Sequence, residues 1–233
     1  MNVEFEWLKR AAGERAAELV EDGMRVGLGS GSTALAFVGA LGQRTRDGLR
    51  VTAVATSEQT AEAARSAGIE LVQLDAPLDL AVDGADAIER GSLAAIKGLG
   101  GALVRERLVA EAARRFVLIA DDSKLVDHLA ESQPDIPIPV EVLPFGWQLT
   151  GARLSAYGEP KLRGSEAGKP FVSDNGNLIL DLFGCDLRDP ATLAARLKAT
   201  TGVVDHGLFL GLASTALIAT PAGVAVLNAG APR

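Results

Sequence analysis

Apolar residues recur at two different spacings along the chain. In the N-terminal stretch, Leu8, Ala12 and Ala16 follow one another at helical spacing with charged residues between them. This spacing predicts an amphipathic helix over residues 4–20. The next apolar run, Met24 to Leu28, is continuous and ends in glycines, which is typical of a buried strand followed by a tight turn. The chain therefore begins with a helix and then a strand.

Apolar runs and helical segments continue to alternate through the first half of the chain. Each run is apolar at nearly every position, which is typical of strands in a parallel sheet that helices cover on both faces. Ser57 stands at the expected N-cap of one predicted helix. The predicted strands are Val51–Ala55, Glu70–Leu74, Leu78–Val82 and Phe116–Ala120, and the predicted helices cover residues 33–41, 57–67 and 102–115.

A proline cluster at residues 133–139 marks a change in the pattern, which suits a boundary between two packed units. The order of elements after it resembles a split β-α-β sandwich. The last apolar stretch, residues 216–227, predicts a hairpin that returns to the first sheet. The elements predicted between them are strands at Val140–Leu143, Glu159–Leu162 and Val203–Asp205, helices near 146–156 and 190–199, and a hairpin that turns on Asp174–Asn177.

Together these patterns predict an α/β fold. We expect a Rossmann-like parallel sheet covered by helices, plus a smaller α+β domain of the ferredoxin-like kind. The expected boundaries place residues 1–130 and 207–233 in the Rossmann-like catalytic domain and residues 131–206 in the small domain.

Composition narrows the possible partners. The chain has 48% hydrophobic residues and 23 Lys and Arg against 30 Asp and Glu, for a net charge of −7. This composition excludes a disordered chain, and the acidic balance argues against nucleic acid or an anionic membrane as partner. The N-terminus has the charge mixture of neither a signal peptide nor a membrane span, and no later run is long enough to span. With Cys185 as the single cysteine, we expect a cytoplasmic protein.

Polar motifs follow the predicted strands directly. Because the carboxyl ends of parallel strands meet at one edge of a sheet, four such loops converge on one crevice, which is where ligands of open α/β sheets bind. We therefore expect the chemistry there. The four motifs are Gly27–Thr33, Thr56–Thr60, Asp83–Asp86 and Ala120–Lys124.

The first of these loops is rich in glycine and hydroxyl groups and opens a helix. Free N–H groups and the positive end of the helix dipole favour an anion such as phosphate there. The loop lacks the third glycine of a dinucleotide fingerprint, where Ser32 stands, and the lysine of a P-loop. A tight turn that needs glycine only for its backbone is the alternative. Candidate groups for a phosphate cage are Lys9, Lys124 and the hydroxyls of Ser30, Ser32, Thr33 and Ser123.

Acidic and basic residues in the same region suit proton transfer. A carboxylate base and an ammonium that stabilises an oxyanion are what proton abstraction next to a carbonyl requires. The alternative is a capping Asp, a solvated Lys and an exposed helical Glu. His128 and His206 have no Cys or His at metal-ligand spacing, so we predict no metal site. The candidate acid–base residues are Asp83, Asp86, Lys97 and Glu106.

At these residues the chain resembles the ribose-5-phosphate isomerase family, type A. The motifs come in the family's order and spacing and cover nearly the whole chain. They are Gly27–Ala34, Val82–Asp86, Lys97–Leu103 with Arg105 and Glu106, Ala120–Lys124, Pro139–Val142, Asp174–Asn177 and Gly202–Phe209.

The resemblance implies an aldose–ketose isomerase without cofactor or metal, which interconverts ribose 5-phosphate and ribulose 5-phosphate through an enediolate. It implies that Glu106 moves the proton between C1 and C2, that Asp83 assists ring opening and proton transfer to oxygen, and that Lys97 stabilises the enediolate oxygen. It also implies that Asp86 holds sugar hydroxyls and that the protein is a homodimer or tetramer. The implied substrate-binding residues are Lys9, Ser30, Gly31, Ser32, Thr33, Gly84, Ala85, Gly98, Leu99, Gly100 and Lys124.

Three residues depart from the family's usual pattern. Ala87 stands in place of Glu, Leu99 in place of a glycine, and Ser30 in place of Thr. None of these removes a proposed catalytic group. Leu99 places a side chain and a more restricted backbone beside the expected sugar pocket, so we expect it to change kinetic parameters and not the reaction type.

Two other functions remain open on the sequence alone. A non-catalytic sugar-phosphate sensor would share the phosphate loop but would not need Glu106 and Lys97. An acyl or CoA transferase on a related sheet would use a glutamate nucleophile, so a covalent intermediate on Glu106 separates it from an isomerase.

Overall fold

The largest sheet of the protein has seven strands. The structure, a computed structural model, describes residues 3–132, 135–165 and 168–230. The strand order is β15-β14-β7-β4-β1-β2-β3, and all neighbours pair in parallel except β14 and β15. The six parallel strands follow the order of a doubly wound fold, so the Rossmann-like prediction is confirmed. The strands are β1 (Arg25–Leu28), β2 (Thr52–Ala55), β3 (Glu70–Leu71), β4 (Leu80–Gly84), β7 (Phe116–Asp121), β14 (Thr215–Thr220) and β15 (Gly223–Asn228).

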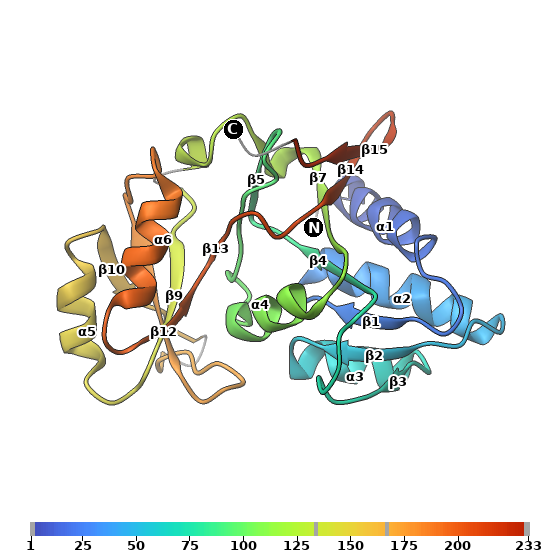
Figure 1. Cartoon of the computed structure of the whole chain (residues 1–233), viewed down its shortest axis with the longest axis horizontal. Helices are drawn as coiled ribbons and strands as arrows, with labels where there is room; N and C mark the ends of the chain where they lie inside the picture. Colours follow the sequence, from blue (N-terminus) through green and yellow to red (C-terminus); the bar gives the residue numbers. More distant parts are fainter. Residues whose placement is uncertain (1–2, 133–134, 166–167, 231–233) are drawn as a thin grey trace.

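Helices cover both faces of this sheet, as Figure 1 shows. On one face Leu8 and Phe37, from two helices that pack together, share a buried apolar cluster with Val26 of β1. On the other face Val109 packs in a second cluster with Leu118 of β7. Burial on both sides explains why these strands are continuously apolar. The helices are α1 (Val3–Ala17), α2 (Ser32–Arg46), α3 (Glu58–Ser66) and α4 (Leu103–Ala112).

A second sheet lies on the opposite side of the molecule, with α4 and β13 drawn between the two (Figure 1). Its order, β10-β11-β9-β12, with antiparallel neighbours throughout, is that of the predicted split β-α-β arrangement. The elements are β9 (Ile138–Val142), α5 (Trp147–Leu154), β10 (Glu159–Leu162), β11 (Leu178–Phe183), α6 (Pro190–Ala199) and β12 (Val203–His206). The hairpin turn is also found, since Ser173 N donates to Asn177 O at 2.9 Å.

A third sheet, of four short strands, was not predicted. Its order is β13-β6-β5-β8, and β13 pairs with β6 through Leu208 and Ile96. This pairing fixes the end of β6, from which Lys97 follows directly. The strands are β5 (Ala87–Glu89), β6 (Ala95–Ile96), β8 (Leu125–Val126) and β13 (Leu208–Phe209), with short 3-10 turns at η1 (Asp122–Lys124) and η2 (Leu129–Ser132).

Several predicted boundaries were wrong. The helix expected over 102–115 ends at Ala112, because Leu78 bridges to Ala113 and accepts a hydrogen bond from Arg114 N. The helix expected over 33–41 runs on to Arg46. The helices expected over 4–20 and 146–156 are shorter at their ends, and the strand expected over 70–74 is shorter as well.

The C-terminal hairpin joins the large sheet as predicted, because β14 pairs with β7. Ser57 also caps α3, accepting a hydrogen bond from Thr60 N at 3.1 Å. Within the described ranges, no helix is both long and apolar enough to cross a lipid bilayer.

Candidate active site

A cavity of about 240 Å³ opens at the carboxyl ends of β1, β4 and β7. This is the edge at which the sequence predicts the crevice, beside the switch point between β1 and β4. Of the predicted site residues, Asp83, Leu99 and Ser123 do not line it, and Asp121 lines it without having been proposed as a site residue. The lining residues are Lys9, Ser30, Gly31, Ser32, Thr33, Gly84, Ala85, Asp86, Lys97, Gly98, Gly100, Glu106, Asp121 and Lys124.

The loop after β1 presents an open helix terminus to this cavity. Gly31, with φ of 86°, precedes the first residue of α2, and no side chain in the described ranges caps the helix. The positive φ favours glycine, and the uncapped N–H groups of the first turn suit an anion. Lys9 from α1 and Lys124 from η1 line the same cavity. Lys9 Nζ lies 3.1 Å from Glu6 Oε1.

Asp83 holds this loop against β4. Its Oδ1 accepts hydrogen bonds from Ser30 N at 3.0 Å and from Gly84 N at 2.7 Å. A Cβ on Gly29 would lie 2.1 Å from the same oxygen, so only glycine lets the loop approach the carboxylate. Asp83 belongs to β4 itself and not to the loop after it, which corrects the predicted end of the strand at Val82.

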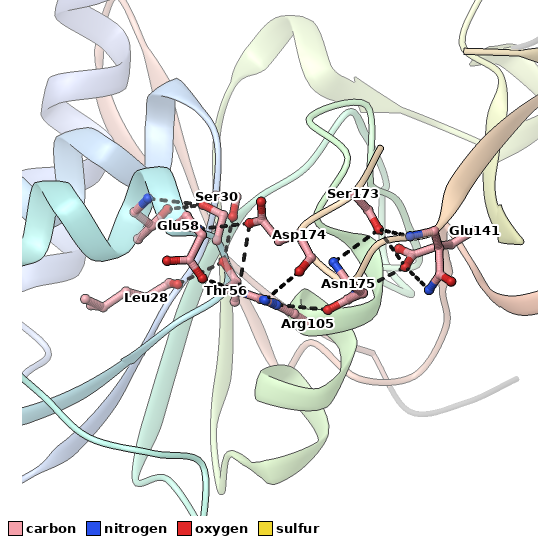
Figure 2. Close-up of polar contacts among 12 residues, drawn as sticks. Leu28, Ser30, Thr56, Glu58, Arg105, Glu141, Ser173, Asp174 and Asn175 are labelled. Carbon is pink, nitrogen blue, oxygen red and sulfur yellow. Dashed lines mark hydrogen bonds and ion pairs between the residues drawn. The ribbon is translucent and has the colours of Figure 1, made fainter. Parts of the chain in front are cut away.

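The motif after β2, Thr56–Thr60, was predicted to reach the crevice, but none of its residues lines the cavity; it supports the loop after β1 from outside. Thr56 donates to Leu28 O at 3.0 Å, and its hydroxyl oxygen lies 2.6 Å from that of Ser30 (Figure 2). Since the single hydroxyl proton of Thr56 is used on Leu28, Ser30 is the donor in the second contact. Ser30 has the same hydroxyl group as the threonine that the family usually has there, so this departure removes no hydrogen-bonding group.

Lys97 lies in a buried group of charges. Its side chain is 2% exposed, and its Nζ lies 2.9 Å from Asp83 Oδ2 and 3.5 Å from Glu106 Oε2. The same ammonium donates to Gly84 O, and it lies 5.5 Å from the centre of the Phe209 ring. Two buried carboxylates on one ammonium leave an excess of negative charge, which makes it costly to ionise both acids.

Glu106 has the protonation chemistry of a base that works near neutral pH. Burial raises its pKa to about 8; Lys97 opposes this effect, while Asp83 and Asp86 add to it. Among the residues that the structure describes, Glu106 Oε2 has no hydrogen-bond partner. This oxygen is the one that lies 3.5 Å from Lys97 Nζ, so the ion pair holds the carboxylate at the cavity, where its raised pKa lets it take up a proton.

Asp86 faces the segment that follows Lys97. Its Oδ2 accepts a hydrogen bond from Leu99 N at 3.0 Å. Burial raises its pKa, although the Leu99 N–H, Lys97, Lys124 and Arg163 act in the opposite direction.

The pKa of Asp83 is also raised, because the effect of burial outweighs that of Lys97. Burial alone would lower the pKa of Lys97, but the surrounding carboxylates outweigh it and raise that pKa.

The structure accommodates two of the departures from the family pattern. Leu99 is 42% exposed, and it is not among the residues with positive φ, so a side chain fits this backbone without strain. Ala87, on β5 of the third sheet, is buried in the apolar cluster that it shares with the second sheet, and it is not among the residues lining the cavity.

A network of hydrogen bonds from the second sheet reaches Arg105, the residue next to Glu106 (Figure 2). Arg105 donates to Asn175 Oδ1, Asp174 O and Glu58 Oε1 at 2.9–3.0 Å. Asn175 in turn donates to the buried Glu141 Oε1 at 3.1 Å. Sequence reasoning did not find these contacts, although Asp174–Asn177 and Glu141 are part of the motifs that carry the family resemblance.

His206 is a buried structural residue at the edge of this region. Its Nδ1 accepts a hydrogen bond from Leu208 N at 3.2 Å, and burial lowers its pKa to about 4.

In the parts of the chain that the structure covers, no group of three or more His, Cys, Asp or Glu side chains is arranged to hold a metal ion.

The fold and this site together define a Rossmann-like α/β enzyme, with a buried group of acidic and basic side chains beside an uncapped helix terminus. A family model described as ribose 5-phosphate isomerase A (phosphoriboisomerase A) matches residues 52–223. The chain belongs to that family, and it is therefore an isomerase; the non-catalytic sensor is not favoured.

Named relatives extend over nearly the full length. A ribose-5-phosphate isomerase A from Thermomicrobium roseum is 52% identical over 223 residues, covering 94% of this chain and 93% of the relative. A solved ribose 5-phosphate isomerase A from Methanocaldococcus jannaschii superposes with a TM-score of 0.91 at 38% identity, covering 96% of this chain and 99% of that one. A solved D-ribose-5-phosphate isomerase in complex with phospho-erythronic acid has a TM-score of 0.90 at 34% identity, covering 98% and 100%.

Proposed function

We propose that the protein interconverts D-ribose 5-phosphate and D-ribulose 5-phosphate through an enediolate, with its own side chains as acid and base. The observation that carries this proposal is Glu106. Its buried carboxylate, with a pKa of about 8 because of burial, has one oxygen without a hydrogen bond in the described chain and lies 3.5 Å from Lys97. Proton abstraction next to a carbonyl needs this pair of groups.

In the reaction, Glu106 removes the proton from C2 of the open-chain aldose. The electron pair of the C–H bond forms the C1–C2 double bond, and the carbonyl oxygen on C1 takes up the negative charge. A proton moves from the oxygen on C2 to the oxygen on C1, and Glu106 returns its proton to C1, which gives the ketose. Atoms and charge are therefore conserved without an added reactant.

Lys97 stabilises the oxyanion. An ammonium has three protons, of which Asp83 and Gly84 O take two. The third serves the ion pair with Glu106 at 3.5 Å and is shared with a substrate oxygen that binds beside that carboxylate. Asp83 assists ring opening and proton transfer between oxygens through Lys97, which it contacts at 2.9 Å. Its raised pKa, caused by burial, suits that role.

The remaining site residues bind the substrate. The N–H groups at the start of α2, with Lys9, Lys124 and the hydroxyls of the loop, hold the phosphate. Asp86 accepts hydrogen bonds from sugar hydroxyls. The residues we assign to binding are Lys9, Ser30, Gly31, Ser32, Thr33, Gly84, Ala85, Gly98, Leu99, Gly100 and Lys124, with Leu99 taking part through its backbone.

The test is conversion of ribose 5-phosphate to ribulose 5-phosphate by the purified protein in EDTA. The proposal requires conversion, and it requires phospho-erythronic acid, a four-carbon acid phosphate, to inhibit competitively. Ribose 5-phosphate that binds without conversion would support the sensor, and an acyl adduct on Glu106 would support the transferase. Absence of binding would overturn the proposal and the sensor together.

We also propose that the protein assembles as a homodimer or homotetramer. Three large apolar residues around α5 support this proposal, since Leu143, Phe145 and Leu149 are 50%, 95% and 66% exposed. Light scattering behind size-exclusion chromatography should give a multiple of the chain mass, and Phe145→Ser should shift it toward the monomer. A monomeric wild-type protein would contradict the proposal.

We further propose a two-domain organisation and a cytoplasmic location. Residues 131–206 would form the small α+β domain, and residues 1–130 with 207–233 the catalytic domain. Separate apolar clusters under the two main sheets support this division. The single, buried Cys185 suits a reducing compartment. Limited proteolysis tests the domain division, which predicts that the first cuts fall near residue 131 and residue 206. Cell fractionation tests the cytoplasmic location.

A further inference from the structure

Arg163, directly after β10 of the second sheet, reaches across to the segment that follows Lys97. Its Nη1 donates to Gly98 O at 3.0 Å and to Leu99 O at 2.8 Å. The rest of the guanidinium is held by Asp181 on β11, with Nε donating to Oδ2 at 2.8 Å and Nη2 to Oδ1. The side chains of Arg163 and Asp181 are 12% and 15% exposed, so this pair is largely shielded from solvent.

The two carbonyl contacts fix the direction of two successive peptide groups. In a planar trans peptide the C=O and the N–H point in opposite directions. Gly98 O points to Arg163, and the N–H of the same peptide, that of Leu99, accordingly points to Asp86 Oδ2 at 3.0 Å. Leu99 O also points to Arg163, so the N–H of Gly100 points away from Arg163, toward the side on which Asp86 and the cavity lie.

The Gly100 N–H is available to a ligand. Gly100 lines the cavity, and no acceptor within the described residues is paired with its N–H. A preorganised backbone donor beside Lys97 is suited to an oxygen on which negative charge develops. A guanidinium on the carbonyl of the same peptide also polarises the N–H and strengthens the hydrogen bond that it donates.

We propose that Arg163, held by Asp181, is a positioning residue for the isomerisation: it turns the 98–100 backbone so that the Gly100 N–H donates to a substrate oxygen next to Lys97. The inference rests on the proposed function. Arg163 itself does not line the cavity, so it acts through the backbone that it holds.

Phosphate binding at the loop after β1 serves as a control for this role, because Arg163 does not contact that loop. Arg163 contacts Asp181, the 98–99 carbonyls and, at 5.9 Å, the Phe171 ring, none of which belongs to the loop after β1. Loss of the guanidinium therefore affects the sugar end of the cavity and leaves the phosphate end intact. A residue that only stabilised the fold would affect both ends together.

The test measures kcat, KM and the inhibition constant of inorganic phosphate for Arg163→Gln. The variant should lose at least about tenfold in kcat/KM, whereas the phosphate inhibition constant stays within twofold of the wild-type value. Arg188→Gln is the matched control, because Arg188 forms a similar pair with Asp186 at the exposed surface. Its kcat/KM and phosphate constant should both stay at the wild-type level.

Two results would overturn the inference: an Arg163→Gln enzyme with wild-type kcat/KM, or one in which phosphate affinity falls in parallel with kcat/KM. If Arg163→Gln does not fold, Arg163→Lys takes its place, since lysine keeps the charge for Asp181 but lacks the fork that reaches both carbonyls. It must show the same split between the two constants. A wild-type protein without isomerase activity would instead refute the proposed function, so the two failures are distinguishable.

Discussion

Lys97 Nζ lies 3.5 Å from Glu106 Oε2, and the two side chains are 2% and 4% exposed. Burial makes each charge costly on its own, and their proximity compensates only part of that cost because Asp83 shares the same ammonium. Ionisation of the buried Glu106 carboxyl is therefore costly, and its pKa is raised. This raised pKa is the physical origin of its proposed role as a base. It also connects stability, pH and activity in this protein.

Glu106 should destabilise the protein as the pH rises. Its pKa, raised by burial from 4.5 to about 8 in the folded state, means that folding favours the protonated acid. The stabilising contribution is complete below pH 4.5 and is lost as the pH rises toward 8. Glu106→Gln should therefore unfold like the wild type at pH 4.5 but be more stable at pH 8, by on the order of 4 kcal/mol. Urea unfolding at both pH values measures this, and a constant difference would contradict it.

Lys97 should be essential for stability as well as activity. Lys97→Met leaves Asp83 and Glu106 buried without a cation, which costs about 3–5 kcal/mol at neutral pH. Adding Asp83→Asn should restore part of that loss, because one of the two carboxylates then needs no partner. Lys198→Met, at a 56% exposed lysine 3.5 Å from Asp205, should cost less than about 1 kcal/mol. Equal losses in the free energy of unfolding for both variants would show that burial does not increase the contribution of Lys97 to stability.

The lysines of the proposed phosphate site should act on binding. Removing either Lys9 or Lys124 takes away one charge-assisted contact to the phosphate, so alanine at each position should raise KM about tenfold with little change in kcat. The control is Lys161→Ala, whose lysine pairs with Glu159 on β10. If kcat fell while KM stayed constant, these lysines would belong to the chemical step and not to phosphate binding.

Leu99→Gly should leave a working enzyme. The side chain is 42% exposed and outside the cavity lining, and both contacts of Leu99, with Asp86 and Arg163, are made by its backbone. Glycine keeps those contacts but adds backbone freedom, so kcat/KM should change by less than about tenfold. Steady-state kinetics with ribose 5-phosphate decides, and a hundredfold loss would show that the leucine side chain shapes the site.

The large sheet was predictable because each of its longer strands is marked by a continuous apolar run in the local sequence. Residues 116–120 are apolar throughout and are buried on both faces of β7, and the motifs that follow β1, β4 and β7 converge because parallel strands end at one edge. The third sheet was not predictable. Strands of two residues, such as Ala95–Ile96 and Leu208–Phe209, have no periodicity, and they form only because the chain brings them together.

The same distinction applies to the site. The sequence placed Glu106 and Lys97 near the crevice from the motifs around them, but it gave no sign that Glu106 would be 4% exposed. Arg163 was missed because it meets Gly98 across 65 positions of sequence and no local pattern marks it. Asp121 belongs to the 120–124 motif that was predicted at the crevice, but it was not among the proposed site residues. The structure shows that it caps η1 through Ser123 N and also lines the cavity.

The most direct test of the account is the isomerisation rate of Glu106→Gln beside Glu111→Gln. Glu111 is an exposed residue of the same helix, so its variant controls for the loss of a carboxylate on α4. Glutamine keeps the shape of Glu106 but cannot accept the C2 proton, so kcat should fall at least about a hundredfold while ribose 5-phosphate still binds. Glu111→Gln should keep the wild-type rate. A Glu106→Gln enzyme with nearly full activity would show that another group moves the proton.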